Sequence, residues 1–330
     1  MNAPDEDFLV LHEFVKAARE RLDSRTWDYL AGGAETETTL KRNRLAIDGI
    51  AFRPRVLRDV LDVDCSGRLL GETMRIPVML APIGSLQDLD PAGGAATARG
   101  AGRYGTVHML SSQAAPGLEA VAEAADGPRI FQLYVRGDRD AIDDYARRAV
   151  AAGYYAFCFT VDLDYYGRRE RDLARRYVTT ARRGVKGEEF QKRFSWDDIK
   201  RFKDTHDIPL IIKGIATAED AAIACEHGVE GIYVSNHGGR QLDHGRGSIE
   251  VLPEVVAAVE GRAAVIVDGG FLRGTDVVKA MALGADAVGV GRLLGYALGA
   301  AGADGVARML EILESEIRGT LGMLGVTSWS

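Results

Sequence analysis

A histidine and an arginine lie three residues apart, directly after a short apolar run. The run Gly231–Val234 is rich in β-branched and aromatic residues and predicts a buried strand. The nonapeptide Ser-Asn-His-Gly-Gly-Arg-Gln-Leu-Asp, residues 235–243, follows it. His237 can take up a proton near neutral pH, and the planar fork of Arg240 suits a carboxylate or a phosphate. The pair suits oxidation of an acidic alcohol, although a lone histidine and arginine would more often belong to a capped surface loop.

The elements that would position this pair recur along the chain. From Ile76 onward, short apolar runs alternate with longer amphipathic segments, and all but one of the runs are followed promptly by a predicted helix. Parallel strands need such crossovers, and near-continuous apolar strands indicate a sheet that is covered on both faces. The predicted strands are Val78–Ala81, Val107–Leu110, Ile130–Tyr134, Phe157–Val161, Leu210–Ile212, Gly231–Val234, Val265–Val267 and Ala287–Val290.

Eight repeats predict an α/β protein with a closed (β/α)₈ barrel, the TIM barrel, rather than an open sheet. No G-x-G-x-x-G turn follows the first strand, which argues against a nicotinamide-binding Rossmann domain. We predict one domain over residues 1–330: an extension over 1–75 and a barrel over 76–330. The extension is predicted to be helical over 8–48, with strand-like runs at 51–54 and 60–63. A last helix is predicted at about 306–323.

In such a barrel the chemistry lies where the strands end in the carboxyl direction. Each predicted strand carries polar or glycine residues at that end, and their convergence on one face predicts a ligand site. The residues at these strand ends are Pro82, Ile83 and Gly84; Ser111 and Gln113; Gln132 and Tyr134; Thr160 and Asp162; Lys213; Ser235 and His237; Asp268 and Gly270; and Gly291 and Arg292.

The connection after the fourth strand, residues 163–195, is long and rich in arginine. Connections of this length are usually functional or disordered. A solvated arm and an active-site lid are both compatible with its composition.

The composition limits the partners. A net charge of −7 over 330 residues predicts no bulk attraction to nucleic acid or to an anionic membrane surface. No apolar run approaches a membrane span, and no signal-peptide pattern begins the chain. The three cysteines are widely spaced, which suggests neither a disulfide framework nor a metal site. A cytoplasmic location is expected.

The chain resembles the FMN-dependent 2-hydroxy-acid oxidases and dehydrogenases, the family of glycolate oxidase, lactate oxidase and mandelate dehydrogenase. The resemblance extends from Asp28 to the last helix, and its motifs occur in order. They are Tyr29 before 31–34 (Ala-Gly-Gly-Ala), 131–134 (Phe-Gln-Leu-Tyr), 160–162 (Thr-Val-Asp), 167–169 (Gly-Arg-Arg), 213–214 (Lys-Gly), 235–243, 268–270 (Asp-Gly-Gly) and 291–292 (Gly-Arg).

The resemblance implies oxidation of an L-2-hydroxy acid to a 2-oxo acid. His237 would take the hydroxyl proton, Asp162 would orient His237, and Tyr134 would bind the substrate hydroxyl. Arg240, Arg169 and the Tyr29 hydroxyl would hold the substrate carboxylate. The 2-hydrogen would pass as hydride to flavin N5, and dioxygen or another acceptor would reoxidise the flavin.

The resemblance also implies an FMN site. Lys213 would lie at the N1–C2 edge of the flavin and stabilise negative charge there. One set of residues would contact the flavin ring system, and a second set would contact the ribityl and phosphate tail. These are Pro82, Ile83, Ser111, Gln132, Thr160 and Ser235 for the ring, and Asp268, Gly270, Arg273, Gly291 and Arg292 for the tail.

Departures from the family pattern affect the pocket and the phosphate site. Leu272 stands where the family usually has a cation, with Arg273 next to it, so we expect easier loss of FMN. Gly84 stands where alanine is common and Gln113 where an aromatic residue is common. Together with the shortened lid, these changes predict a preference for mandelate-like or longer acids over glycolate. Refilling of the space by Ile83 is the alternative.

Two other functions remain possible from the sequence. One is an FMN barrel enzyme with a different reaction, such as an isomerase, and the other is a non-catalytic binding barrel. The carboxylate-binding set argues against the first, and the complete set of polar strand ends argues against the second. A homotetramer or higher homo-oligomer is expected.

Overall fold

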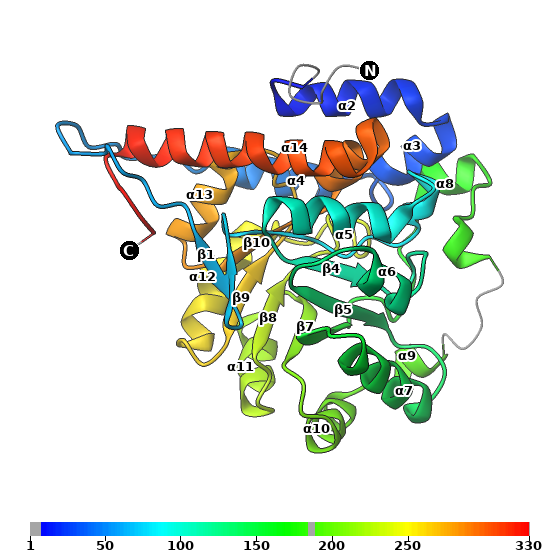
Figure 1. Cartoon of the computed structure of the whole chain (residues 1–330). Helices are drawn as coiled ribbons and strands as arrows, with labels where there is room; N and C mark the ends of the chain where they lie inside the picture. The colour runs from blue at the N-terminus through cyan, green and yellow to red at the C-terminus, as the bar shows by residue number, and fades with distance from the viewer. Residues whose placement is uncertain (1–7, 184–188, 330) are drawn as a thin grey trace.

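The computed structural model describes residues 8–183 and 189–329, and its centre is a closed barrel of eight parallel strands (Figure 1). Each strand pairs with its neighbours in chain order, and β10 closes the ring against β3. All eight predicted barrel strands are confirmed, with ends that differ from the prediction by no more than three residues. The strands are β3 Val78–Leu80, β4 His108–Ser111, β5 Arg129–Tyr134, β6 Ala156–Thr160, β7 Leu210–Ile215, β8 Gly231–Val234, β9 Ala264–Val267 and β10 Ala287–Val290.

Helices surround the barrel, as the crossover argument requires (Figure 1). The predicted last helix is the second half of a longer element, α14 (Arg292–Leu324), which breaks at Ala301 and Gly302. Gly302 has φ +59°, a conformation that glycine adopts without strain. The other helices of the ring are α5 Gly93–Tyr104, α6 Leu118–Ala124, α7 Arg139–Ala151, α10 Trp196–Thr205, α11 Ala218–Glu226, α12 Ser248–Val259 and α13 Gly274–Ala282.

The interior of the barrel is filled by side chains and closed at its amino end by a hairpin. Strands β1 (Gly67–Leu69) and β2 (Glu72–Met74) pair antiparallel. Their Leu69 and Met74 pack with barrel residues such as Met109 and Tyr233, which are also buried. The sequence did not predict this hairpin, because each strand has only three residues.

The strand-like runs predicted at 51–54 and 60–63 are wrong. Both segments lie in an extended connection without regular structure. A strand needs a neighbouring strand to satisfy its backbone groups, and neither run has one. The side chains of Val56, Leu57 and Leu61 in this connection are exposed.

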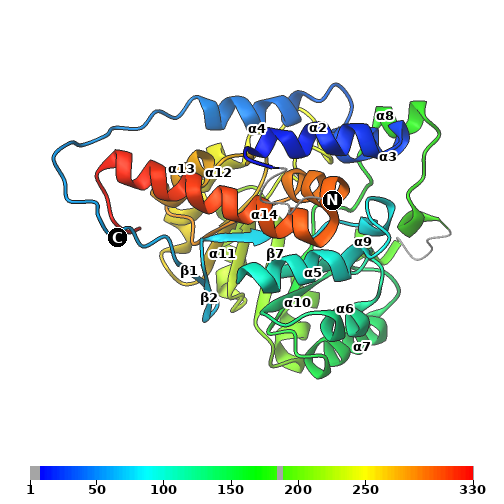
Figure 2. The ribbon, with the colours of Figure 1, turned by 45° about the horizontal axis from the view of Figure 1, so that its top comes forward.

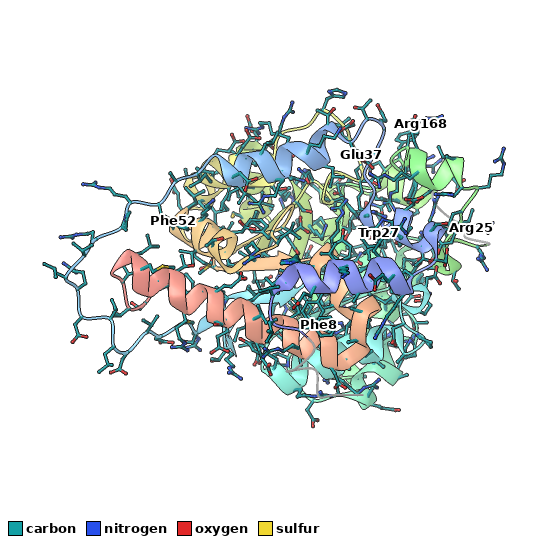
Figure 3. The ribbon with its side chains drawn as sticks, turned by 90° about the horizontal axis from the view of Figure 1, so that it is seen from above. Phe8, Arg25, Trp27, Glu37, Phe52 and Arg168 are labelled. Atoms are coloured by element: carbon teal, nitrogen blue, oxygen red, sulfur yellow. The ribbon has the colours of Figure 1, made fainter. Side chains whose placement is uncertain are left out.

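The extension begins with two helices that cover one side of the barrel. Helix α2 (Leu11–Arg21) lies beside α14 (Figures 1 and 3). Arg308 of α14 donates to the Phe8 carbonyl over 3.0 Å. Helix α3 (Ser24–Ala31) is capped by Asp23, which accepts from the backbone N–H groups of residues 25 and 26. Asp23 therefore marks the start of this helix, and Gly32 is its C-cap.

Helix α4 (Thr38–Asp48) is held against the loop that follows β8 (Figure 2). The Asp243 carboxylate accepts hydrogen bonds from the backbone N–H of Thr39 at 2.7 Å and of Thr36 at 3.1 Å. Asn43 and Asn236 exchange side-chain hydrogen bonds of 2.9 and 2.8 Å. The nonapeptide therefore fixes α4 as well as its own strand end.

The long connection after β6 contains short helices and returns to the barrel mouth. They are α8 Glu170–Ala174, the 3₁₀ turn η2 Thr180–Arg182 and α9 Glu189–Arg193. Residues 184–188 of the predicted lid lie outside the described residues. Another 3₁₀ turn, η1 Leu86–Asp88, follows β3.

Candidate active site

A cavity of about 410 Å³ opens at the carboxyl ends of the barrel strands. It gathers side chains from α3, α4, seven of the barrel strands or the loops that follow them, and the connection after β6. Most of the predicted site residues line it. They are Tyr29, Pro82, Ile83, Gly84, Gln113, Tyr134, Arg169, Lys213, His237, Arg240, Asp268, Gly270, Gly291 and Arg292.

His237 is the best-positioned proton acceptor in this cavity. Its Nδ1 lies 3.0 and 3.2 Å from the two carboxylate oxygens of Asp162. A carboxylate at Nδ1 favours the tautomer with the proton on that nitrogen, which leaves the Nε2 lone pair for a substrate. Burial lowers the pKa of His237 and outweighs the opposing charge of Asp162. The imidazole is therefore neutral and able to accept a proton at neutral pH.

The backbone of the nonapeptide turns sharply at the histidine. His237, Gly238 and Gly239 have consecutive φ values of +57°, +65° and +75°. The histidine N–H donates to the Ser235 hydroxyl over 3.0 Å. A side chain at Gly239 would collide with the backbone of Leu40, 2.5 Å away. The two glycines thus allow His237 and Arg240 to face one cavity while the loop packs against α4.

Tyr134 and Tyr29 bring two phenol groups to the site. The Tyr134 hydroxyl lies 3.3 Å from Nε2 of His237. Burial raises the pKa of Tyr134 well above its ordinary value, so the phenol keeps its proton and can donate it in a hydrogen bond. The Tyr29 hydroxyl donates to the Gly84 carbonyl over 3.1 Å, and burial also raises the pKa of Tyr29.

Arg240 is fixed by carbonyl groups of the extension. One of its guanidinium nitrogens, Nη1, donates to the carbonyls of Tyr29 at 2.6 Å and Gly32 at 2.9 Å. The guanidinium also lies 4.8 Å from the centre of the Tyr29 ring. Arg169 approaches from the connection after β6, and its Nε donates to the Arg240 carbonyl over 3.4 Å. The predicted carboxylate-binding residues are thus assembled from three distant parts of the chain.

Lys213 forms a buried charged cluster behind the histidine. Its Nζ donates to the Ser235 hydroxyl over 2.9 Å and lies 3.7 Å from a carboxylate oxygen of Asp268. Burial would lower the pKa of Lys213, but the charges of Asp268 and Asp162 outweigh burial and place the pKa above its ordinary value. Lys213 is therefore a permanent cation at the floor of the cavity.

Four polar residues are buried just beneath the cavity: Ser111, Gln132 and Thr160 on the neighbouring strands β4, β5 and β6, and Ser235 directly after β8. Both amide atoms of Gln132 and the hydroxyl of Thr160 have no hydrogen-bond partner among the described residues. Buried polar atoms without partners are costly. These atoms indicate a ligand that presents both donors and acceptors to this edge.

Arg292 lies at the start of α14, with Nη1 and Nη2 donating to the carbonyls of Gly238 and Gly32 at 2.9 and 2.7 Å. Its Nε is buried and has no partner in the described part of the chain. Burial and the nearby charge of Arg240 lower the pKa of Arg292 to about 10. Within residues 8–183 and 189–329, no carboxylate pairs with Arg169, Arg240 or Arg292. These three cations indicate that the cavity binds anions.

Arg273 is the predicted phosphate-site residue that does not line the cavity, whereas Asp268, Gly270, Gly291 and Arg292 do. Its guanidinium pairs with Glu316 of α14 at 2.6 Å. Arg273 is the N-cap of α13, and its side chain therefore follows the outer surface. Leu272 lines the cavity in its place.

Several lining residues were missing from the sequence-based site. Tyr166 and Arg182 come from the connection after β6, Arg136 follows β5, and Lys41 and Arg44 lie on α4. Arg136 donates to the Gln113 side chain over 2.7 Å. Only the position of Tyr166, close to Gly167-Arg-Arg169, was a usable sequence signal.

A parallel barrel whose mouth holds a histidine–carboxylate pair, a buried lysine and three unpaired guanidinium groups is typical of enzymes that act on anionic ligands. The FMN-dependent dehydrogenase family matches residues 18–330. Glycolate oxidase 3 of Arabidopsis thaliana is 42% identical over 340 residues, covering 96% of this chain and 92% of that protein. Glycolate oxidase of Spinacia oleracea is 39% identical with the same coverage.

Solved structures that are similar to this chain come from enzymes of the same kind. A mandelate oxidase with (S)-mandelic acid superposes with a TM-score of 0.92 at 39% identity, covering 98% of this chain and 96% of that one. A mandelate oxidase with benzoyl-formic acid gives the same TM-score and identity. The chain belongs to the FMN-dependent dehydrogenase family, and its cofactor is FMN. The prediction of a flavin oxidoreductase is confirmed over the isomerase and binding-barrel alternatives.

The residues present fit FMN. The unpartnered atoms of Gln132 and Thr160 suit the polar edge of a flavin, and Lys213 suits negative charge on it. The amino end of α14, with Arg292 beside it, suits a phosphate, because helix N-termini bind anions. FMN supplies the site with an acceptor for two electrons and a hydrogen.

Proposed function

We propose that this enzyme oxidises an L-2-hydroxy acid to the 2-oxo acid. The observation that carries the proposal is the placement of a neutral imidazole nitrogen of His237 and the guanidinium groups of Arg240 and Arg169 in one cavity. A 2-hydroxy acid presents a carboxylate and an adjacent hydroxyl, which match the two kinds of group. The curated relatives named as glycolate oxidases support this substrate class.

In the proposed reaction, Arg240, Arg169 and Tyr29 hold the substrate carboxylate. His237 removes the hydroxyl proton at Nε2, and Asp162 stabilises the imidazolium that results. The Tyr134 phenol donates a hydrogen bond to the substrate oxygen. The carbon–hydrogen bond at C2 breaks with its electron pair, so the substrate loses two electrons and two hydrogens in total.

We also propose that the substrate is larger than glycolate. An added Cβ at Gly84 would lie 3.1 Å from Cβ of Gln113, so the two small or flexible residues share one space. Tyr166 borders the same cavity and offers an aromatic surface. The similar mandelate oxidase structure with (S)-mandelic acid supports an aromatic acid. Ile83 also lines the cavity, and it would reduce the space available to a large substrate side chain if it turned inward.

The test is a panel of 2-hydroxy acids mixed anaerobically with the purified yellow enzyme. Bleaching of the flavin by L-2-hydroxy acids, and by neither their esters nor simple alcohols, is expected. We propose dioxygen as the electron acceptor, because the relatives are named oxidases. Readmission of air should then restore the yellow colour within seconds and produce hydrogen peroxide. Slow recovery in air that a quinone accelerates would indicate a dehydrogenase instead.

The oligomeric state and the compartment are also proposals. The side chains of Val56, Leu57 and Leu61 are apolar and exposed, and their burial against a second copy would support a homo-oligomer such as a tetramer. Sedimentation of the wild type and of Leu57→Asp should show a larger assembly only for the former. Three free cysteines support a reducing cytoplasm. None of the helices in the described chain could cross a membrane.

A further inference from the structure

The phosphate end of the FMN site contains an unusual distribution of charge. A barrel of this kind binds phosphate beyond its seventh and eighth strands, here β9 and β10. A phosphate monoester carries a charge of about −1.5 to −2 at neutral pH, so one cation does not balance it. Arg292 supplies one buried cation at the start of α14. The loop after β9 supplies none to the cavity, because Leu272 is apolar and Arg273 pairs with Glu316.

Helix α4 borders this end of the cavity. The backbone at Gly270 touches α4 so closely that an added Cβ would lie 3.1 Å from Asn43 and 3.3 Å from the Arg44 nitrogen. Arg44 Nη1 donates to the Gly270 carbonyl over 2.9 Å. Leu40, Lys41 and Arg44 of α4 line the cavity together with Gly270 and Leu272. A cation on this helix face can therefore reach the phosphate.

The two cations of that face differ in their partners. Arg44 bonds to both carboxylate oxygens of Asp276, at 2.6 and 2.8 Å, and to Asp48 at 2.6 Å. Two carboxylates thus already neutralise its charge. The Lys41 ammonium makes only a 3.4 Å contact to the Thr36 carbonyl among the described residues, and the side chain is exposed at the cavity mouth. Lys41 is the cation whose charge remains available.

We propose that Lys41 of α4 is the second phosphate-binding cation of the FMN site and takes the place that Leu272 leaves without charge. The phosphate then lies between Lys41 on one side and Arg292 with the start of α14 on the other. The N-terminal extension therefore contributes directly to cofactor affinity. The expectation of easier FMN loss, drawn from Leu272 alone, is replaced by one of firm retention.

The test compares FMN with riboflavin, which lacks the phosphate. The full-length enzyme is stripped of flavin, and both ligands are titrated by quenching of flavin fluorescence. For Lys41→Met we expect the dissociation constant of FMN to rise about tenfold, as for a partly exposed charge-assisted contact. Riboflavin affinity should be unchanged. The FMN release rate of the diluted holoenzyme should rise in parallel.

Three further variants separate charge from packing. Lys41→Arg should retain FMN affinity, and Lys41→Met combined with Leu272→Arg should restore it from the loop after β9. Lys200→Met, which removes an exposed lysine paired with Asp204 on α10, is the matched control and should change nothing. The affinity gap between wild type and Lys41→Met should shrink at high salt. Equal weakening of FMN and riboflavin, or an unchanged FMN affinity in Lys41→Met, would overturn the proposal.

Discussion

The Asp162 carboxylate lies 3.0 Å from Nδ1 of His237. Asp162 follows β6 and His237 follows β8, which is two positions away in the barrel. The contact fixes the orientation of the imidazole and the nitrogen that carries its proton. It also places a negative charge where the imidazolium of the proposed reaction would form. Burial keeps the histidine neutral before the substrate binds.

Replacing His237 with alanine should slow anaerobic flavin reduction about 100-fold or more, because the general base is lost. FMN should remain bound, since the proposed flavin contacts come from other residues. Stopped-flow absorbance of the flavin measures both properties. Near-normal reduction in this variant would contradict the assigned role. Asp162→Asn should also slow reduction, because Nδ1 loses its ionic partner.

The pH dependence should follow the lowered pKa of His237. The base is active when neutral, which requires a pH above the pKa in the folded enzyme. Because burial lowers that pKa below the ordinary value of about 6.5, the reduction rate should fall to half of its maximum only below pH 6.5 as the pH is lowered. A profile of the reduction rate against pH tests this order. A fall that begins well above pH 7 would mean that Asp162 outweighs burial.

Replacing Arg240 with lysine should raise the dissociation constant of the substrate and slow flavin reduction. The charge is kept, but an ammonium group lacks the planar donor fork with which the guanidinium can bind a carboxylate through two N–H groups while it donates to the Tyr29 carbonyl. Binding is measured from the substrate dependence of flavin bleaching. Arg262→Lys, which changes an arginine bound to carbonyls of α12, is the control. Equal turnover of acids and their esters by the wild type would remove the basis for this assignment.

Gly84→Ala should reduce kcat/KM for mandelate-like acids more than for glycolate. The new methyl would stand 3.1 Å from Gln113 Cβ and occupy the space proposed for a large substrate group. Apolar burial is worth about 25 cal/mol per Å², so a small loss of contact area is measurable. The test measures kcat/KM of the wild type and of Gly84→Ala with a mandelate-like acid and with glycolate. If wild type oxidises glycolate most efficiently, the size proposal fails and the FMN assignment is unaffected.

Replacing Asp243 with alanine should destabilise the protein by about 1–3 kcal/mol, because several N–H and hydroxyl donors of residues 36–39 lose their acceptor. Despite burial, the hydrogen bonds from Thr39 and Thr36 hold the pKa of Asp243 far below its usual range. A lowered folded pKa stabilises above the unfolded value of about 3.9 and loses that effect as the pH falls. The difference in Tm between variant and wild type should therefore be constant from pH 7 to 5 and shrink below pH 4. A constant difference down to pH 2.5 would argue against an ionised cap.

The sequence predicted the barrel well because each strand is a short apolar run bounded by polar residues. It also predicted many of the residues that line the cavity, because a parallel barrel brings its strand ends together. The hairpin of β1 and β2 was missed because three-residue strands carry no period. Lys41 and Arg136 were missed because nothing local distinguishes them from surface cations, and only tertiary packing turns them toward the cavity. Arg273 was wrongly predicted to line the cavity. Its pairing with Glu316 depends on the tertiary position of α14, which the local sequence does not show.

The three guanidinium groups of Arg169, Arg240 and Arg292, which all line the cavity, have a consequence for the amount of enzyme in a cell. Without a bound anion, these like charges repel one another in the folded chain. A ligand that binds only the folded form increases the population of folded protein. Flavin supply should then set protein abundance as well as activity. A cell that is short of riboflavin is expected to degrade newly made chains rather than store them. Pulse-chase labelling with and without riboflavin measures this as a change in half-life.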